Sequence, residues 1–208
     1  MTDRHDGDFR VDGEPDELDE RRRSVFAGEW SWLRQVHGAQ VVAVNHIGEG
    51  AGSEADAAVT EQVDAVLCVQ TADCVPVVLV GDGVLGVAHA GWRGLVAGVI
   101  QETVNAMQQR RPGAVAAIIG PCIRPASYEF GEAELAQVEV AVGGSARATT
   151  SAGRPALDMA TATAHALRAA GVTSIDDLGF DTADPRWFSH RVRRDGGRQV
   201  TAARLVAS

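Results

Sequence analysis

The segment Thr71–Gly94, TADCVPVVLVGDGVLGVAHAGWRG, decides the fold and also places the chemistry. Its two apolar runs are joined by Gly81 to Gly83, a pattern that predicts a tight β-hairpin of buried strands. Cys74 begins the first run, His89 ends the second, and a glycine-flanked Trp-Arg turn then leads into a helix. Reactive side chains at strand ends beside a helix N-terminus are typical of an active site on an α/β scaffold.

Hydrophobic periodicity and breaker residues predict the elements on either side of this hairpin. Residues 95–110 repeat apolar side chains at intervals of three and four, which predicts one continuous helix stopped by Pro112 and Gly113. Other helices are expected over 16–29, with Asp16 as N-cap, 132–140 and 157–170. Strands are expected over 33–36, 41–45, 57–60, 65–70, 75–80, 84–89 and 114–119, followed by a final hairpin of 187–192 with 199–206.

Strands paired by hairpins, mixed with strands crossed by helices, predict an α/β (α+β) fold: a single-domain mixed β-sheet covered by helices. The 208 residues, 45% of them hydrophobic, suffice for one well-buried domain and hardly for two. We divide the chain into an acidic N-terminal arm with a short helix, residues 1–30, and a catalytic domain, residues 31–208. We expect the start of the arm to be either mobile or a strand that finds its partner late.

The charge balance narrows the classes of partner. A formal net charge of -9 argues against a nucleic-acid surface or an anionic membrane surface. All 19 basic residues are arginine, so lysine-based Schiff-base chemistry and a P-loop lysine are excluded. An anionic substrate would therefore have to be bound by a local cluster of arginines.

The cysteines and the N-terminus indicate the compartment. Three cysteines without framework spacing fit a reducing environment. The polar, charged N-terminus has no apolar signal region, and no run approaches the roughly 18 apolar residues of a membrane span. We expect a cytoplasmic, soluble protein. The sequence does not specify its oligomeric state.

Three residues at predicted strand ends stand out as possible metal ligands: His37, Cys74 and His89. Two histidines and one thiolate leave a fourth tetrahedral position open, which is the catalytic form of a zinc site. Zinc there would lower the pKa of a bound water to roughly 7. Taken singly, a cysteine such as Cys74 is more often an inert buried thiol, and a histidine such as His37 is more often structural.

Several neighbouring residues suit an anion or a proton. Arg93 lies among the free N–H groups at the start of the 95–110 helix, where phosphate binds well. A tight strand-to-helix turn with an exposed arginine would explain Arg93 equally well. His190 and Arg191 in the tail are candidates to join the same crevice, although histidine and arginine are also common on surfaces. Asp73 is a candidate proton carrier beside the metal or, alternatively, a residue that orients a ligand.

The candidate site residues lie in motifs that resemble those of one known family. In chain order these are QVHG (35–38), ADAAVT (55–60), TADCVPVVL (71–79), HAGWRG (89–94), IGPCIRPASYEFG (119–131) and WFSHR (187–191). The sequence is similar to the laccase-domain proteins, once called multicopper polyphenol oxidases and also described as purine nucleoside phosphorylases with adenosine deaminase activity. One branch is described as peptidoglycan-editing factors. The resemblance runs from about Trp32 to the C-terminus.

The resemblance implies a single-domain α/β fold and one zinc ion bound by His37, Cys74 and His89. It implies phosphorolysis of adenosine, inosine, guanosine and methylthioadenosine, together with deamination of adenosine. The partners would be a purine nucleoside and inorganic phosphate. Under this interpretation Gln35, Arg93, His190 and Arg191 contact the substrate, and Cys74, Asp73 and Arg93 serve catalysis.

The chain departs from the family pattern in three places, one of which is the absence, around Arg21 to Arg23, of the asparagine that often precedes the arginine at the first helix. Its N-terminal part is shortened, and Asp181-Thr182 stands where the family commonly has Cys-Thr. Other interpretations therefore stay open. One is a hydrolase that edits a cell-wall precursor with Cys74 as nucleophile. Another is copper oxidation of phenols, although the only methionines are Met1, Met107 and Met159. The last is a binding protein without turnover.

Overall fold

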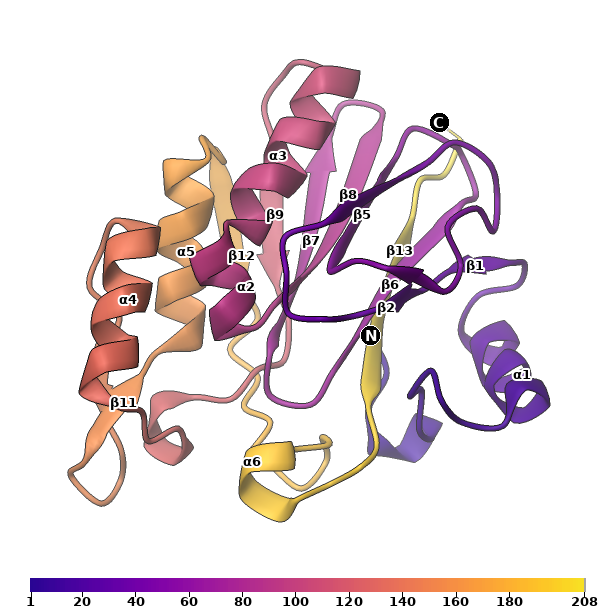
Figure 1. The fold of residues 1–208 in the computed structure, drawn as a ribbon. Coiled ribbons are helices and arrows are strands. Elements are labelled where there is room, and N and C mark those ends of the chain that lie inside the picture. The colour runs from indigo at the N-terminus through magenta and orange to yellow at the C-terminus, as the bar shows by residue number, and fades with distance from the viewer. Residues whose placement is uncertain (208) are drawn as a thin grey trace.

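Secondary structure is stacked in three layers in the computed structural model, which describes residues 1–207 (Figure 1). A six-stranded mixed sheet forms the middle layer, helices α2 to α5 cover one face, and a three-stranded sheet covers the other. This arrangement confirms the predicted single-domain mixed sheet covered by helices. Three hydrophobic clusters fill the spaces between the layers and beneath α1.

The middle sheet has the strand order β12-β9-β7-β8-β5-β3. The outer pairs β3/β5 and β9/β12 are parallel and the inner pairs are antiparallel. Its strands are β3 (Val41–Val44), β5 (Ala57–Thr60), β7 (Val75–Gly81), β8 (Val84–Ala90), β9 (Ala116–Ile119) and β12 (Ser174–Asp177). The predicted β7–β8 hairpin is confirmed, with Val75 opposite Ala90 and Gly81 opposite Val84.

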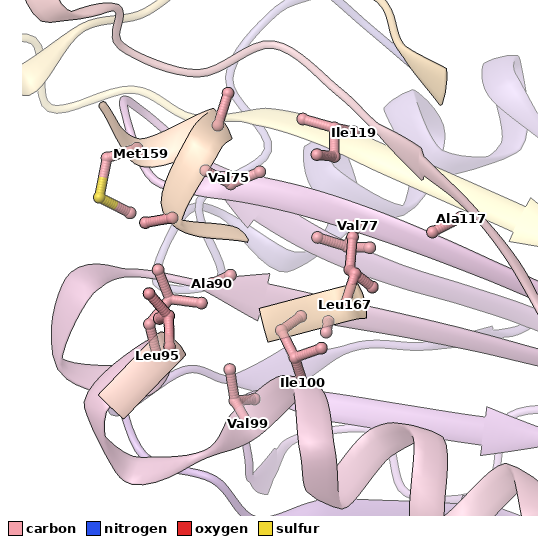
Figure 2. Packing of buried hydrophobic residues seen from close by; sticks show 14 of the residues in the cluster. Val75, Val77, Ala90, Leu95, Val99, Ile100, Ala117, Ile119, Met159 and Leu167 are labelled. Carbon is pink, nitrogen blue, oxygen red and sulfur yellow. The ribbon is translucent and has the colours of Figure 1, made fainter. Parts of the chain in front are cut away.

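The helical layer is α2 (Trp92–Ala97), α3 (Val99–Arg110), α4 (Glu132–Val142) and α5 (Met159–Ala169). One continuous helix over 95–110 was the wrong prediction, because Gly98 has φ +89 and breaks it into α2 and α3. That left-handed conformation suits glycine. Figure 2 shows how Leu95, Val99 and Ile100 then pack against β7, β8 and α5.

The three-stranded sheet consists of β1 (Trp30–Ser31), β6 (Val66–Thr71) and β13 (Gln199–Arg204), with β6 in the centre. Side chains of β6 alternate, so Leu67 and Val69 face the middle sheet whereas Val66 and Cys68 face the N-terminal region. The predicted final hairpin is wrong. Residues His190–Arg193 form α6, and β13 pairs antiparallel with β6 instead.

The N-terminal arm packs against this smaller sheet. Phe9 N donates to Arg198 O at 2.9 Å, and Phe9 is buried in the same cluster as Leu18 and Trp30. The arm contains a 3-10 turn, η1 (Arg4–Asp6), and the helix α1 (Pro15–Val25), which begins after Glu14 rather than at Asp16.

Short elements complete the fold. They are β2 (Leu33–Arg34), β4 (Ser53–Glu54), β10 (Arg147–Thr149), β11 (Pro155–Leu157) and η2 (Pro125–Ser127). The helix predicted over 157–170 starts at Met159, because Pro155–Leu157 pairs with β10 and Asp158 caps the helix through Thr161 N. Over residues 1–207, no helix has both the length and the apolar character needed to cross a membrane.

Candidate functional site

Three side chains that are far apart in the sequence meet at one end of the middle sheet. His37 follows β2, Cys74 immediately precedes β7 and His89 is the penultimate residue of β8. Their possible ligand atoms all lie within 4.8 Å of one another, and Cys74 Sγ is 3.9 Å from His37 Nε2. Within residues 1–207 this is the only group of three or more such side chains with that geometry. Imidazole nitrogen and thiolate sulfur suit zinc or copper, so the cluster can hold a metal ion.

The carboxylate of Asp56 holds the two histidines in place. It is fully buried and accepts hydrogen bonds from His89 Nδ1 at 2.8 Å and His37 N at 3.0 Å. It also accepts from Val36 N at 3.2 Å and Gly38 N at 2.7 Å. Because Nδ1 of His89 donates to Asp56, the lone pair on Nε2 is left for a ligand. These contacts hold the pKa of Asp56 below its ordinary value, since they outweigh the effect of burial.

Cys74 and His89 shift each other's pKa in opposite directions. Burial would raise the pKa of Cys74, but the charge of His89 and the hydrogen bond to His37 outweigh it and lower the pKa to about 6. Burial would lower the pKa of His89, but Cys74 and Asp56 raise it to about 9. Burial instead raises the pKa of the thiols Cys68 and Cys122 to about 12. Of the three thiols, Cys74 therefore has the reactive, ligand-competent form at neutral pH.

Gly91 leaves room for the cluster. A Cβ atom at this position would lie 2.8 Å from His37 Cδ2 and 3.1 Å from Cys74 Sγ. The backbone at Gly91 has φ -75, so any residue type fits the local conformation. Glycine is required here by the close approach of the two ligands and not by the turn itself.

Asp73 ties the C-terminal segment to the site. Its carboxylate accepts hydrogen bonds from Thr182 Oγ1 at 2.7 Å, Ser189 Oγ at 2.6 Å and Arg191 N at 2.6 Å. The residue is buried and has φ +98, a left-handed backbone conformation. Through these bonds Asp73 fixes the start of α6, which carries His190 and Arg191.

All the predicted site residues line one crevice of about 470 Å³. They are Gln35, His37, Asp73, Cys74, His89, Arg93, His190 and Arg191. The guanidinium of Arg93 lies 4.4 Å from the ring centre of Trp92, and that of Arg191 lies 4.6 Å from the ring centre of Tyr128. Stacking on these rings leaves the edges of both cations available to an anion.

Gln35 uses its side chain on the protein itself. Its amide donates to Gln70 O at 2.7 Å and accepts from Gln70 N at 2.7 Å, joining β2 to β6. The buried hydroxyl of Thr71, also in the crevice wall, has no hydrogen-bond partner within residues 1–207. A buried polar group without a partner indicates a place where a ligand would supply the missing bond.

Sequence reasoning missed the carboxylate that supports the cluster, Asp56, and several wall residues of the crevice, Arg198 among them. Asp56 opens an otherwise apolar strand in ADAAVT, and a lone acidic residue at the edge of a buried run was the available signal. Arg198 lies in the tail beyond any motif and reaches the crevice only because β13 pairs with β6. No local sequence pattern predicts that Arg198 lies at the crevice.

Comparisons with known proteins agree with one another. A family model described as multi-copper polyphenol oxidoreductase laccase matches residues 4–206. A purine nucleoside phosphorylase of Xylella fastidiosa is 39% identical over 184 residues, 83% of this chain and 70% of that protein. The purine nucleoside phosphorylase YfiH of Shigella flexneri is 34% identical over 204 residues, 92% of this chain and 82% of that protein. The crystal structure of YlmD from Geobacillus stearothermophilus has a TM-score of 0.84 and 25% identity, covering 96% of this chain and 85% of that one.

Proposed function

Since the chain belongs to the multi-copper polyphenol oxidoreductase laccase family, with relatives named purine nucleoside phosphorylase, we propose that it is a zinc-dependent purine nucleoside phosphorylase. One observation carries the proposal. The His37-Cys74-His89 cluster and the stacked cations of Arg93 and Arg191 open into the same crevice. Phosphate-dependent cleavage of a neutral nucleoside needs a site for the phosphate anion, and a metal ion held beside it could stabilise charge that develops during the reaction.

The donor set fits zinc in its open, catalytic form. With Nδ1 of His89 bonded to Asp56 and the pKa of Cys74 lowered, the cluster offers one imidazole nitrogen from each histidine and a thiolate. A zinc ion held by these three residues would supply a Lewis acid in the crevice. We extend the proposal to methylthioadenosine phosphorolysis and adenosine deamination, the activities that the resemblance implies.

The chain's own residues bind and orient the reactants. Arg93 has no carboxylate within 4.0 Å among residues 1–207, and its side chain is exposed to the crevice, so it is free to hold phosphate. Arg191 is held in place through its backbone N–H, which donates to Asp73, while its guanidinium also donates to Glu129 O at 3.0 Å. The three hydrogen bonds that Asp73 accepts support an anchoring role for this carboxylate.

A cysteine hydrolase is the second candidate function. The pKa of Cys74 is lowered to about 6, with His37 Nε2 at 3.9 Å, which is the arrangement of an activated thiolate beside a base. One thiolate does not serve as ligand and nucleophile together, so metal content separates the two functions. The copper oxidase interpretation receives less support, because Met107, in α3, is buried in the core against Gly86 and supplies no axial ligand.

The test combines elemental analysis with a base-release assay. Purified wild type, Cys74→Ser and His89→Ala are compared, with Cys122→Ala as the matched control for a buried thiol outside the cluster. We expect about one zinc per wild-type chain and phosphate-dependent release of purine base, both lost in the two cluster variants and kept in the control. Full phosphorolysis by metal-free His89→Ala would contradict the proposal. If metal-free protein has hydrolase activity, and alkylation of Cys74 abolishes that activity, the second candidate function would be established instead.

A further inference from the structure

The arginines of this chain fall into two groups according to their partners. Within residues 1–207, eleven of the 19 lie within 4.0 Å of a carboxylate oxygen and the other eight do not. The eight without a carboxylate partner are Arg23, Arg34, Arg93, Arg168, Arg186, Arg191, Arg194 and Arg198. Four of them gather in one place, around the crevice and the hollow next to it: Arg34, Arg93, Arg191 and Arg198.

The hollow that adjoins the crevice has a volume of about 370 Å³. The two spaces are neighbours, because they share three wall residues, Gln35, Gln70 and Arg198. Arg93 and Arg191 lie on the side of the metal cluster, and Arg34 lies on the far side. Arg198 stands between them, with its Nη1 held by Gly196 O at 3.0 Å and Gly197 O at 2.8 Å.

Arg10 also lines this hollow, but its charge is neutralised by carboxylates. Its Nε lies 3.2 Å from Asp8 and 3.8 Å from Asp12, so two carboxylates balance its charge. Arg34 is exposed and has no such partner within residues 1–207. Asp12 lines the hollow and Asp73 lines the crevice, but neither carboxylate lies within 4.0 Å of the guanidinium of Arg34, Arg93, Arg191 or Arg198. In a chain of net charge -9, these cations create a local positive region in each of the two spaces.

We propose that the hollow lined by Arg34 and Arg198 is a second anion subsite, and that the substrates include purine nucleoside 5′-monophosphates besides the neutral nucleosides. The inference rests on the proposed phosphorylase function. The attacking inorganic phosphate lies at Arg93 and Arg191, and the 5′-phosphate of the nucleotide lies at Arg34 and Arg198. The sugar spans the wall formed by Gln35 and Gln70.

The reaction is balanced without further reagents. An oxygen of hydrogen phosphate forms a bond to C1′ of the ribose while the C1′–N9 bond breaks, and the electron pair leaves with the base. The proton of the hydrogen phosphate passes to the purine nitrogen. The products are the free purine base and ribose 1,5-bisphosphate.

The test is binding calorimetry of the purified metal-loaded protein with adenosine and with adenosine 5′-monophosphate. Both titrations are made with saturating inorganic phosphate, which fills the first subsite. The variants are Arg34→Gln and Arg198→Gln. Arg168→Gln in α5 is the matched control, because Arg168 also has no carboxylate partner within residues 1–207 and lies outside both spaces. Base release from each ligand is followed in parallel.

We expect the monophosphate to bind at least tenfold more tightly than adenosine, a difference of about 1.4 kcal/mol. Either crevice variant should remove most of this advantage, and Arg168→Gln should keep it. Equal affinities of the two ligands in the presence of phosphate, or an advantage of the monophosphate that survives in both variants, would overturn the subsite. Tight binding of the monophosphate without base release would refute the phosphorylase function while the subsite stands. Failure of both ligands to bind would refute both.

Discussion

Asp56 and Asp73 are two buried carboxylates beside the same cluster, yet they hold different regions of the chain. Asp56 binds the backbone around His37 and the ring of His89, and so belongs to the ligand region. Asp73 binds Thr182, Ser189 and Arg191, and so belongs to the tail region. The positions of the metal ligands therefore depend on Asp56, whereas the position of the anion-binding Arg191 depends on Asp73. Single substitutions should perturb one without the other.

The largest effect is expected from Asp56→Asn. The amide nitrogen of asparagine would face N–H groups that now donate to a carboxylate, and His89 would lose its charged partner. We expect zinc affinity to fall about 10- to 100-fold and the free energy of unfolding to drop by about 3 kcal/mol. Chelator competition and urea denaturation measure the two quantities. Unchanged zinc affinity would show that Asp56 does not orient the ligands.

Asp73→Asn should affect the tail region and spare the metal. We expect a loss of about 1–3 kcal/mol in unfolding free energy, because the donors that Asp73 accepts from are buried. Zinc affinity should stay within about threefold, and KM for phosphate should rise about tenfold as Arg191 is released. A large fall in kcat with unchanged KM would instead identify Asp73 as the proton carrier that the sequence suggested.

Gly91→Ala tests the space between the ligands without touching either carboxylate. The added methyl group would displace His37 or Cys74, so we expect zinc affinity to fall about fivefold, on the order of 1 kcal/mol. Gly113→Ala is the matched control, because a Cβ there meets nothing within 4 Å and its φ is not positive. Equal zinc affinities in the two variants would mean that the ligands adjust freely.

The smallest effect concerns the acid stability of the tail region. Burial would raise the pKa of Asp195, but the hydrogen bond from Ser189 N and the Arg4 guanidinium lower it below its usual value. A lowered folded-state pKa adds stability above the unfolded-state pKa of about 3.9, and this stability is lost as pH falls through the folded-state value.

The corresponding variant is Asp195→Asn. Between about pH 5 and pH 2 the wild type should lose up to about 1 kcal/mol more stability than Asp195→Asn. Thermal unfolding as a function of pH measures the difference. If the stability of the two proteins depends on pH in the same way, Asp195 does not stabilise the tail region.

The sequence by itself determined the fold class, the β7–β8 hairpin and the cluster residues. Apolar runs bounded by glycines specify local strands, and the motifs around His37, Cys74 and His89 lie at strand ends, where side chains converge. The sequence did not reveal the break at Gly98, because a periodic apolar face continues across a single glycine.

Only the tertiary structure decided the partners of β13, the role of Asp56 and the arrangement of the arginines. Pairing β13 with β6 instead of with 187–192 joins segments more than 100 residues apart, which no local propensity specifies. The same pairing carries Arg198 to the crevice, whereas Asp56 reaches His89 because β5 lies beside β8. The long-range pairing of strands therefore determined where the side chains of Arg198 and Asp56 lie and which groups they meet.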